Sequence, residues 1–224
     1  MNGLVIVLSI LLAFVIDASW DGVKNNRSES AALVRLHTEL IGVDDALADW
    51  QSGQRGIGIA SRTLLEQFDI PASNRISIDS VSVLLSRIMI PWSLDPPSAI
   101  LESVESSGLV ASLQNERLVF ELATWKAGLV DLVADEDLIV LRVEQELRPF
   151  MMSRVAWRTV ESSQQRISKL SKSQFDYGVD ELFQSRDFEN HLTWRLRGAE
   201  SLVQSYQEVR EVLSELLKSL SSEL

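Results

Sequence analysis

The spacing of apolar residues constrains this chain more than any other feature, because it repeats in steps of three and four. Near the N-terminus the row is Leu33, Leu36, Leu40, Val43, Leu47 and Trp50. At the C-terminus it is Phe188, Leu192, Leu196, Ala199, Val203, Tyr206, Val209, Leu213, Leu216 and Leu220. Such steps place side chains on one face of a helix, which must then pack lengthwise on a partner. The two rows predict long helices at about 28–50 and 187–223.

A third row predicts a long helix over about 116–147, with Asn115 as its N-terminal cap. Its members are Leu118, Leu122, Trp125, Leu129, Leu132, Ile139, Val143 and Leu147. No stretch alternates apolar and polar residues well enough to require a sheet. The sequence therefore predicts an all-α fold, a bundle of long and roughly antiparallel helices.

Turn residues predict where the helices end. We expect the helix predicted at about 28–50 to stop in the glycine-containing stretch 51–56. The helix predicted at about 116–147 should stop at Pro149. A polar connection is expected over 168–185. Shorter helices are predicted at 59–68, 78–89, 98–106 and 151–167.

The N-terminal apolar run is a candidate membrane anchor. Residues 4–16 carry no charge, and 1–18 would make a helix of roughly 27 Å, just enough to span a bilayer. Trp20 stands at the polar boundary, where indole rings favour the membrane surface. A signal peptide and a helix buried in a soluble core are the alternatives, although Ile16 disagrees with a small-x-small cleavage site. We expect a transmembrane helix at 1–20 that continues into a single bundle domain over 21–224.

Composition excludes much familiar chemistry. The chain has no Cys and two His, which leaves no disulfide, no thiol nucleophile and no histidine-rich metal site. The net charge of -11 disfavours phosphate backbones. We therefore expect no nucleic-acid partner, no cofactor and no bound metal ion.

One acidic cluster is a candidate site. Asp135, Glu136 and Asp137 interrupt the middle row, with Glu136 between Leu132 and Ile139. Either Glu136 is a buried carboxylate that titrates or binds a cation, or the partner helix ends here and the acids face water. The pattern favours the second interpretation, because acidic clusters are usually solvated.

The remaining candidates favour structural roles. His37 lies beside the first row and His191 adjoins Glu189, without the Glu-x-x-His spacing of a di-iron bundle. We interpret both histidines as packing or surface residues, and the six Trp as core and interface anchors. No arrangement of nucleophile, base and orienting group is present, so no catalytic residue is assigned and an enzyme is disfavoured.

Several landmarks suggest a family. They are Ala18-Ser19-Trp20-Asp21 after the apolar run, the stretch 99–109 followed by 113–118, and Asp187-Phe188-Glu189-Asn190. In this order they resemble an uncharacterised family, a domain of unknown function, of bacterial single-pass membrane proteins. The resemblance implies a helical domain anchored in the bacterial inner membrane and carries no catalytic residues.

Basic residues near the apolar run predict the side of the membrane on which the helical domain lies. Lys24 and Arg27 follow the apolar run and nothing basic precedes it, which by the positive-inside rule places the domain in the cytoplasm. The family's relatives usually have a basic leader, which places it outside, and we favour the outside.

Two functions remain open. The first is a membrane-anchored helical protein, without catalysis of its own, that binds a protein partner or ligand or associates with itself. The alternative is a soluble or secreted helical binding module whose N-terminal segment is cleaved or buried.

Overall fold

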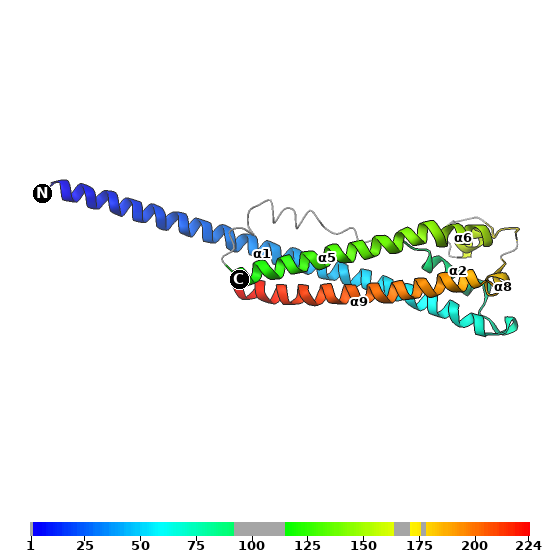
Figure 1. Cartoon of the computed structure of the whole chain (residues 1–224). Coiled ribbons are helices and arrows are strands. Elements are labelled where there is room, and N and C mark those ends of the chain that lie inside the picture. The colour runs from blue at the N-terminus through cyan, green and yellow to red at the C-terminus, as the bar shows by residue number, and fades with distance from the viewer. Residues whose placement is uncertain (1, 92–114, 164–170, 176–177) are drawn as a thin grey trace. The chain divides into compact units, whose positions relative to one another are not determined.

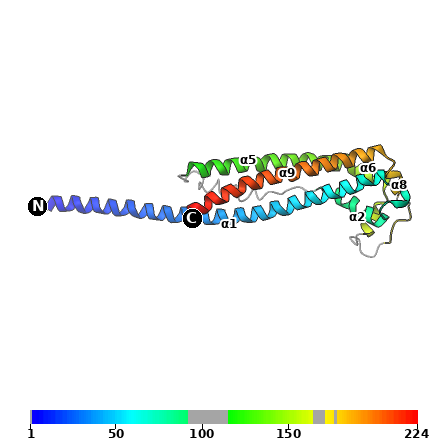
Figure 2. The same cartoon turned by 90° about the horizontal axis from the view of Figure 1, so that it is seen from below.

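The computed structural model contains long helices and short connecting ones (Figures 1 and 2). It describes residues 2–91, 115–163, 171–175 and 178–224, with the side chains of 1–29 and of residue 32 outside this description. The long helices are α1 (Asn2–Glu66), α5 (Glu116–Arg142) and α9 (Arg186–Glu223). All elements in the described ranges are helices or short helical turns, and none is a strand, which confirms the all-α class. The helix predicted at 98–106 lies outside the described residues.

Helix α1 continues past its predicted end. It passes through the glycines of 51–58 without a break, so the expected stop at 51–56 is wrong and the helix predicted at 59–68 is the last part of α1. Each glycine costs a helix up to about 1 kcal/mol relative to alanine. Burial of Ile57, Ala60 and Leu64 on one face opposes that cost, because packing stabilises helices more than propensity does.

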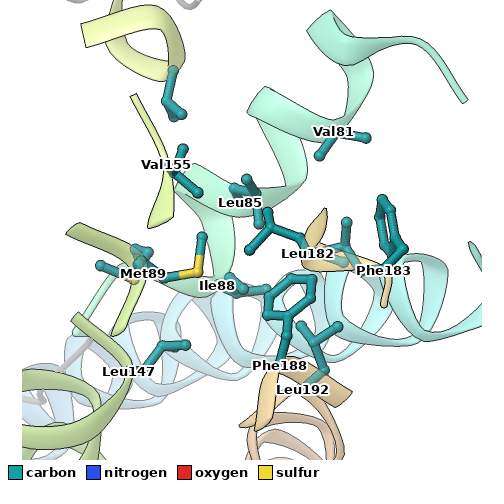
Figure 3. Close-up of a cluster of buried hydrophobic side chains, with 14 residues drawn as sticks. Val81, Leu85, Ile88, Met89, Leu147, Val155, Leu182, Phe183, Phe188 and Leu192 are labelled. Atoms are coloured by element: carbon teal, nitrogen blue, oxygen red, sulfur yellow. The ribbon is translucent and has the colours of Figure 1, made fainter. Parts of the chain in front are cut away.

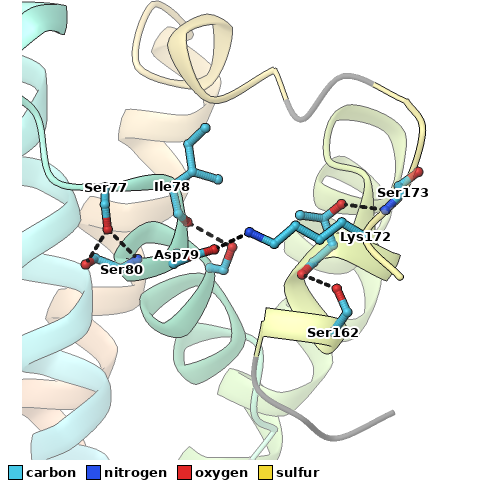
Figure 4. Close-up of polar contacts among 9 residues, drawn as sticks. Ser77, Ile78, Asp79, Ser80, Ser162, Lys172 and Ser173 are labelled. Carbon is cyan, nitrogen blue, oxygen red and sulfur yellow. Dashed lines mark hydrogen bonds and ion pairs between the residues drawn. The ribbon is translucent and has the colours of Figure 1, made fainter. Parts of the chain in front are cut away.

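Helix α2 (Ile78–Ile88) matches its prediction. Ser77 caps it, since its Oγ accepts from the Ser80 N–H at 3.2 Å (Figure 4). Before it lie two short 3-10 turns, η1 (Gln67–Asp69) and η2 (Ala72–Asn74). Lys172 Nζ lies 2.7 Å from Asp79 Oδ1 and holds a distant segment against the first turn of α2.

The predicted stop at Pro149 is also wrong. After α5 the chain makes a π-helical turn, η3 (Val143–Leu147), and continues into α6 (Arg148–Arg154). Pro149 falls in the first turn of α6, directly after this π-helical turn, so the helix continues through the proline with a local π-helical irregularity. The chain leaves the helix at Val155, which is extended, before α7 (Trp157–Ser163). The short helix α8 (Val179–Leu182) then follows Gly178, whose φ of 62° suits a residue without Cβ.

The contacts of the chain form two units. The first contains Met1–Asp44, Pro97–Trp125 and Val212–Leu224. In it the C-terminal part of α9 lies against the other two long helices. His37 Nε2 is 3.0 Å from Ser221 Oγ, and Asn115 Nδ2 donates to Glu223 Oε1 at 2.6 Å. The described side chains that are buried in this unit are apolar: Leu33, Leu36, Leu40, Val43, Leu118, Leu122, Trp125, Leu213, Leu216 and Leu220.

The second unit contains Asp45–Pro96 and Lys126–Glu211. Within it α1 and α9 are antiparallel, because Gln51 Nε2 donates to the Val203 carbonyl at 3.0 Å while Arg62 pairs with Glu200 at 2.5 Å. In this unit the last helix therefore runs antiparallel to the first, as expected for a bundle of roughly antiparallel helices.

A cluster of buried apolar side chains lies in the second unit (Figure 3). The side chains of α2, α8 and the start of α9 meet there, with Leu85, Ile88 and Phe188 completely buried. The rings of Phe150 and Phe188 stack with centroids 6.2 Å apart. This cluster explains why α2 and the short helices gather around the start of α9.

No helix in the described part of the chain is long and apolar enough to cross a membrane. The transmembrane span predicted for residues 1–20 is not supported by this finding, and it falls on residues whose side chains lie outside the description.

Candidate functional site

A carboxylate and a phenol form a buried pair in the second unit. Glu136 of α5 and Tyr206 of α9 are each 0% exposed, and Tyr206 Oη donates a hydrogen bond to Glu136 Oε1. Asp135 and Asp137 are exposed. The interpretation that the acidic cluster faces water is correct for these two aspartates and wrong for Glu136, because the row of α5 continues through position 136.

The surroundings of this pair favour the protonated form of the Tyr206 phenol. Burial raises the pKa of the Tyr206 phenol, and the hydrogen bond to Glu136 raises it further. The phenol therefore stays protonated and remains a donor to the carboxylate. The hydrogen bond gives each group a partner where water cannot reach, and buried polar groups need such partners in a packed core.

Polar side chains of α1 extend this region. Gln51 donates to the Val203 carbonyl and accepts from Arg210 Nη1 at 3.4 Å. Gln54 and Ser61 lie seven residues apart on the same buried face of α1. The side-chain polar atoms of both lack a hydrogen-bond partner in the described structure. The core of the second unit therefore contains polar side chains of α1 among its apolar ones, whereas the described core of the first unit is apolar.

Arg195 is the buried cation of the same unit. Its Nε donates to the Ile88 carbonyl at 3.0 Å and its Nη2 to the Ile90 carbonyl at 2.9 Å. These carbonyls stand at the C-terminal end of α2, where positive charge is favourable. Burial lowers the pKa of Arg195 to about 10, so the side chain is charged at neutral pH.

Sequence reasoning missed Arg195 and the partner role of Tyr206. The buried face of α9 contains Arg195 and Leu202. The row predicted from the sequence has Leu196 and Val203 at these steps, and both are half-buried. Between Leu192 and Ala199 either position satisfies the three-and-four spacing, and hydropathy favours the leucine. An unbroken heptad from Phe188 onward would have selected Arg195.

The histidines have the expected packing or surface roles. His37 is half-buried and contacts Ser221, and His191 lies with its ring centroid 5.0 Å from that of Phe150. Neither observation indicates a ligand. In the ranges that the structure describes, no three His, Asp or Glu side chains gather where a metal ion would bind.

Three of the tryptophans that the structure describes act as anchors. Trp125 is buried in the first unit. In the second unit, Trp157 packs against the apolar cluster and Trp194 carries the Arg142 guanidinium 4.7 Å from its ring centroid. Trp20 and Trp92 lie outside the side chains that the structure describes.

The geometry of the Glu136–Tyr206 pair limits its chemistry. A general acid or base must reach the proton it transfers within hydrogen-bond distance, directly or through one water. Both members of this pair are completely buried and bonded to each other, so in this conformation they contact no substrate. The arrangement acts on the packing of α5 against α9.

Comparisons with known proteins give no match: none among family models, curated proteins or solved structures. The resemblance to an uncharacterised bacterial membrane family therefore stays a prediction.

Proposed function

We propose that this chain is a membrane-anchored helical protein that has no catalysis of its own and acts by binding a protein partner through its helical domain. Residues 1–20 are the anchor. The continuity of α1 carries the proposal, because this one helix begins at Asn2, includes the uncharged run 4–16 and continues into the buried row that starts at Leu33. An anchor and a packed domain joined by unbroken helix hold that domain close to a lipid surface.

The buried acidic residue supports binding over catalysis. Glu136 is the carboxylate that sequence reasoning singles out, and it lies in the core with its proton donor Tyr206. Enzyme sites need an accessible reactive group in a concave surface. Loss of a turnover activity in Glu136→Gln with an unchanged thermal melt would overturn the non-catalytic proposal.

Membrane association is tested by an alkaline carbonate wash of cells that express the full chain. We expect the chain in the membrane pellet, and a variant without residues 1–20 in the supernatant. Release of the full-length chain would overturn the anchor. A mature N-terminus beyond residue 18 would instead establish the alternative, a secreted binding module.

The side of the membrane is tested separately by protease treatment of a C-terminal tag in spheroplasts and in lysed cells. We propose the outer side of the inner membrane, which predicts cleavage in intact spheroplasts. Protection until lysis would place the domain in the cytoplasm and leave the anchor itself intact.

A further inference from the structure

Helix α5 has a second apolar row on the face opposite its buried one. Val130, Leu138 and Leu141 are 60%, 64% and 49% exposed. Ala127 and Ala134 are also exposed and complete the row with steps of three and four. We call Ala127, Val130, Ala134, Leu138 and Leu141 the outer face of α5; all five belong to the second unit.

The two rows of α5 have different environments. The buried row, with Leu129, Leu132 and Glu136, faces α9, whereas the outer face is open to solvent. A helix that is apolar on two opposite sides normally has a neighbour on each, and contiguous exposed apolar surface marks interaction sites. The alanines leave shallow positions between larger side chains, into which the knobs of another helix fit.

Acidic side chains border this face on both sides. By helical geometry Asp131 and Asp135 lie on one flank and Asp137 on the other, and all three are exposed. None of the three is in an ion pair within the described part of the chain. We call them the acidic rim.

The nearby cations do not neutralise the rim. Arg142 Nε is 3.4 Å from Glu146 Oε1, and its guanidinium lies over Trp194. Lys126 is half-buried and has an interaction partner of its own. The rim therefore presents uncompensated negative charge beside an apolar stripe.

The negative charge of the acidic rim favours one kind of binding partner for the outer face of α5 over another. Two copies of the chain that pair symmetrically through this face place their acidic rims against each other, and the net charge of -11 adds to the repulsion. A helix with Lys or Arg on the flanks of its own apolar stripe matches both features. We propose that the outer face of α5 docks an amphipathic, basic helix of a partner protein. This inference rests on the proposed function and specifies the site and chemistry of the partner.

The probe is a synthetic amphipathic helix of about three heptads, with Leu and Ala along its seam and Lys on its flanks; the control peptide has Glu in place of Lys. Full-length chain in detergent is titrated into each labelled peptide, and anisotropy is measured. We expect binding of the Lys peptide and at least about tenfold weaker binding of the Glu peptide. Equal affinity for the two peptides would overturn the proposal.

Variants of the chain localise the site. Leu138→Asp and the pair Asp131→Lys with Asp135→Lys should each weaken binding of the Lys peptide about tenfold or more. The matched control is Glu208→Lys with Glu211→Lys on α9, which makes the same charge change at exposed positions away from the outer face. An equal loss in the control would mean diffuse attraction and overturn the site. Circular dichroism melts confirm that each variant folds.

Two further measurements separate this inference from the proposed function. Sedimentation of the chain and of Leu138→Asp tests self-pairing: a dimer that the substitution dissociates would make a second copy the occupant and overturn the proposal. In cells, a photo-crosslinking residue replaces Leu138, or the exposed Ile59 or Val83 as controls. Adducts to a protein from position 138 alone agree with the proposal. Adducts from the controls alone overturn it and leave the proposed function standing, and no adduct at any position overturns both.

Discussion

The phenol oxygen of Tyr206 donates a hydrogen bond to Oε1 of Glu136 at a point where α9 and α5 bury both side chains completely. Along α9 the neighbours of Tyr206 in the buried row are Leu202 and Val209. A shift of one helix past the other by a turn places the carboxylate against an apolar side chain. The pair therefore specifies the register of α5 on α9, a role known for single polar residues in helical seams.

Removal of the phenol oxygen should destabilise the chain strongly. Tyr206→Phe leaves the buried carboxylate without this donor, and we expect a loss of about 2 kcal/mol or more in the free energy of unfolding. Urea titration monitored by circular dichroism measures it.

The double variant is the control for this pair. Glu136→Leu with Tyr206→Phe replaces both polar groups by apolar ones, so it should be at least as stable as Tyr206→Phe alone. The losses in Glu136→Leu and in Tyr206→Phe are compared with the loss in the double variant. If the two single losses add up to the double loss, there is no coupling energy and the hydrogen bond has no energetic effect.

Alkaline pH should weaken the fold through Tyr206. In the unfolded chain a phenol titrates near pH 10, whereas burial and Glu136 raise the pKa of Tyr206 in the folded protein. Below about pH 10 both states keep the proton and the contribution is constant. Above it the unfolded state binds fewer protons, so the free energy of unfolding falls by up to about 1.4 kcal/mol per pH unit. The difference in stability between the parent and Tyr206→Phe, followed by urea titration across this range, should shrink. A constant difference would contradict the raised pKa.

Arg195 should stabilise the end of α2. Arg195→Met keeps most of the buried stem and removes the donors to the Ile88 and Ile90 carbonyls. One buried and one partly buried acceptor then lose a partner, and we expect a loss of about 2–4 kcal/mol. Hydrogen exchange should rise in the last turn of α2 first. Arg197→Ala is the exposed control on the same helix and should change stability by less than about 0.5 kcal/mol. Similar losses in both variants would contradict the capping role.

Glycine substitutions should separate helix propensity from packing. A Cβ at Gly42 meets nothing within 4 Å, and one at Gly58 meets Ala199 Cβ at 3.7 Å, an ordinary contact. Gly42→Ala and Gly58→Ala should therefore each raise the free energy of unfolding by about 0.5–1 kcal/mol. At Gly198 a Cβ overlaps the end of the Ile139 side chain, which must then shift, so Gly198→Ala should bring a smaller gain than Gly58→Ala. Thermal melts distinguish the three variants, and a gain at Gly198 equal to that at Gly58 would contradict this packing.

The sequence predicted the helical elements well where the apolar rows are regular. The class of fold and the ranges of α2 and α9 follow from local patterns that tertiary packing reinforces. The helix ends were less predictable. The stops expected at 51–56 and at Pro149 rest on the intrinsic behaviour of Gly and Pro, and burial of neighbouring residues opposes that behaviour.

The candidate site was predictable in part. The spacing of α5 indicates that Glu136 occupies a seam position, yet the sequence does not identify the side chain that faces it. Tyr206 lies 70 positions away in sequence, and its pairing with Glu136 depends on the register of two helices. Arg195 was hidden for a related reason, since the apolar Leu196 next to it is the stronger signal for a buried position.

The shared core of the first unit provides the last prediction. Leu40 and Leu213 are both 0% exposed, and each lies in an apolar row. Leu40→Asp and Leu213→Asp should each lower the free energy of unfolding by about 3 kcal/mol or more, because each buries an unpaired charge. Glu39 is the matched control beside Leu40; its side chain is 32% exposed and its pair with Arg35 is 3.5 Å long. Since such surface pairs contribute little, Glu39→Ala should change stability by less than about 0.5 kcal/mol. Thermal melts of the full chain measure all three, and two Asp variants that melt like the parent would show that α1 and α9 share no core in this unit.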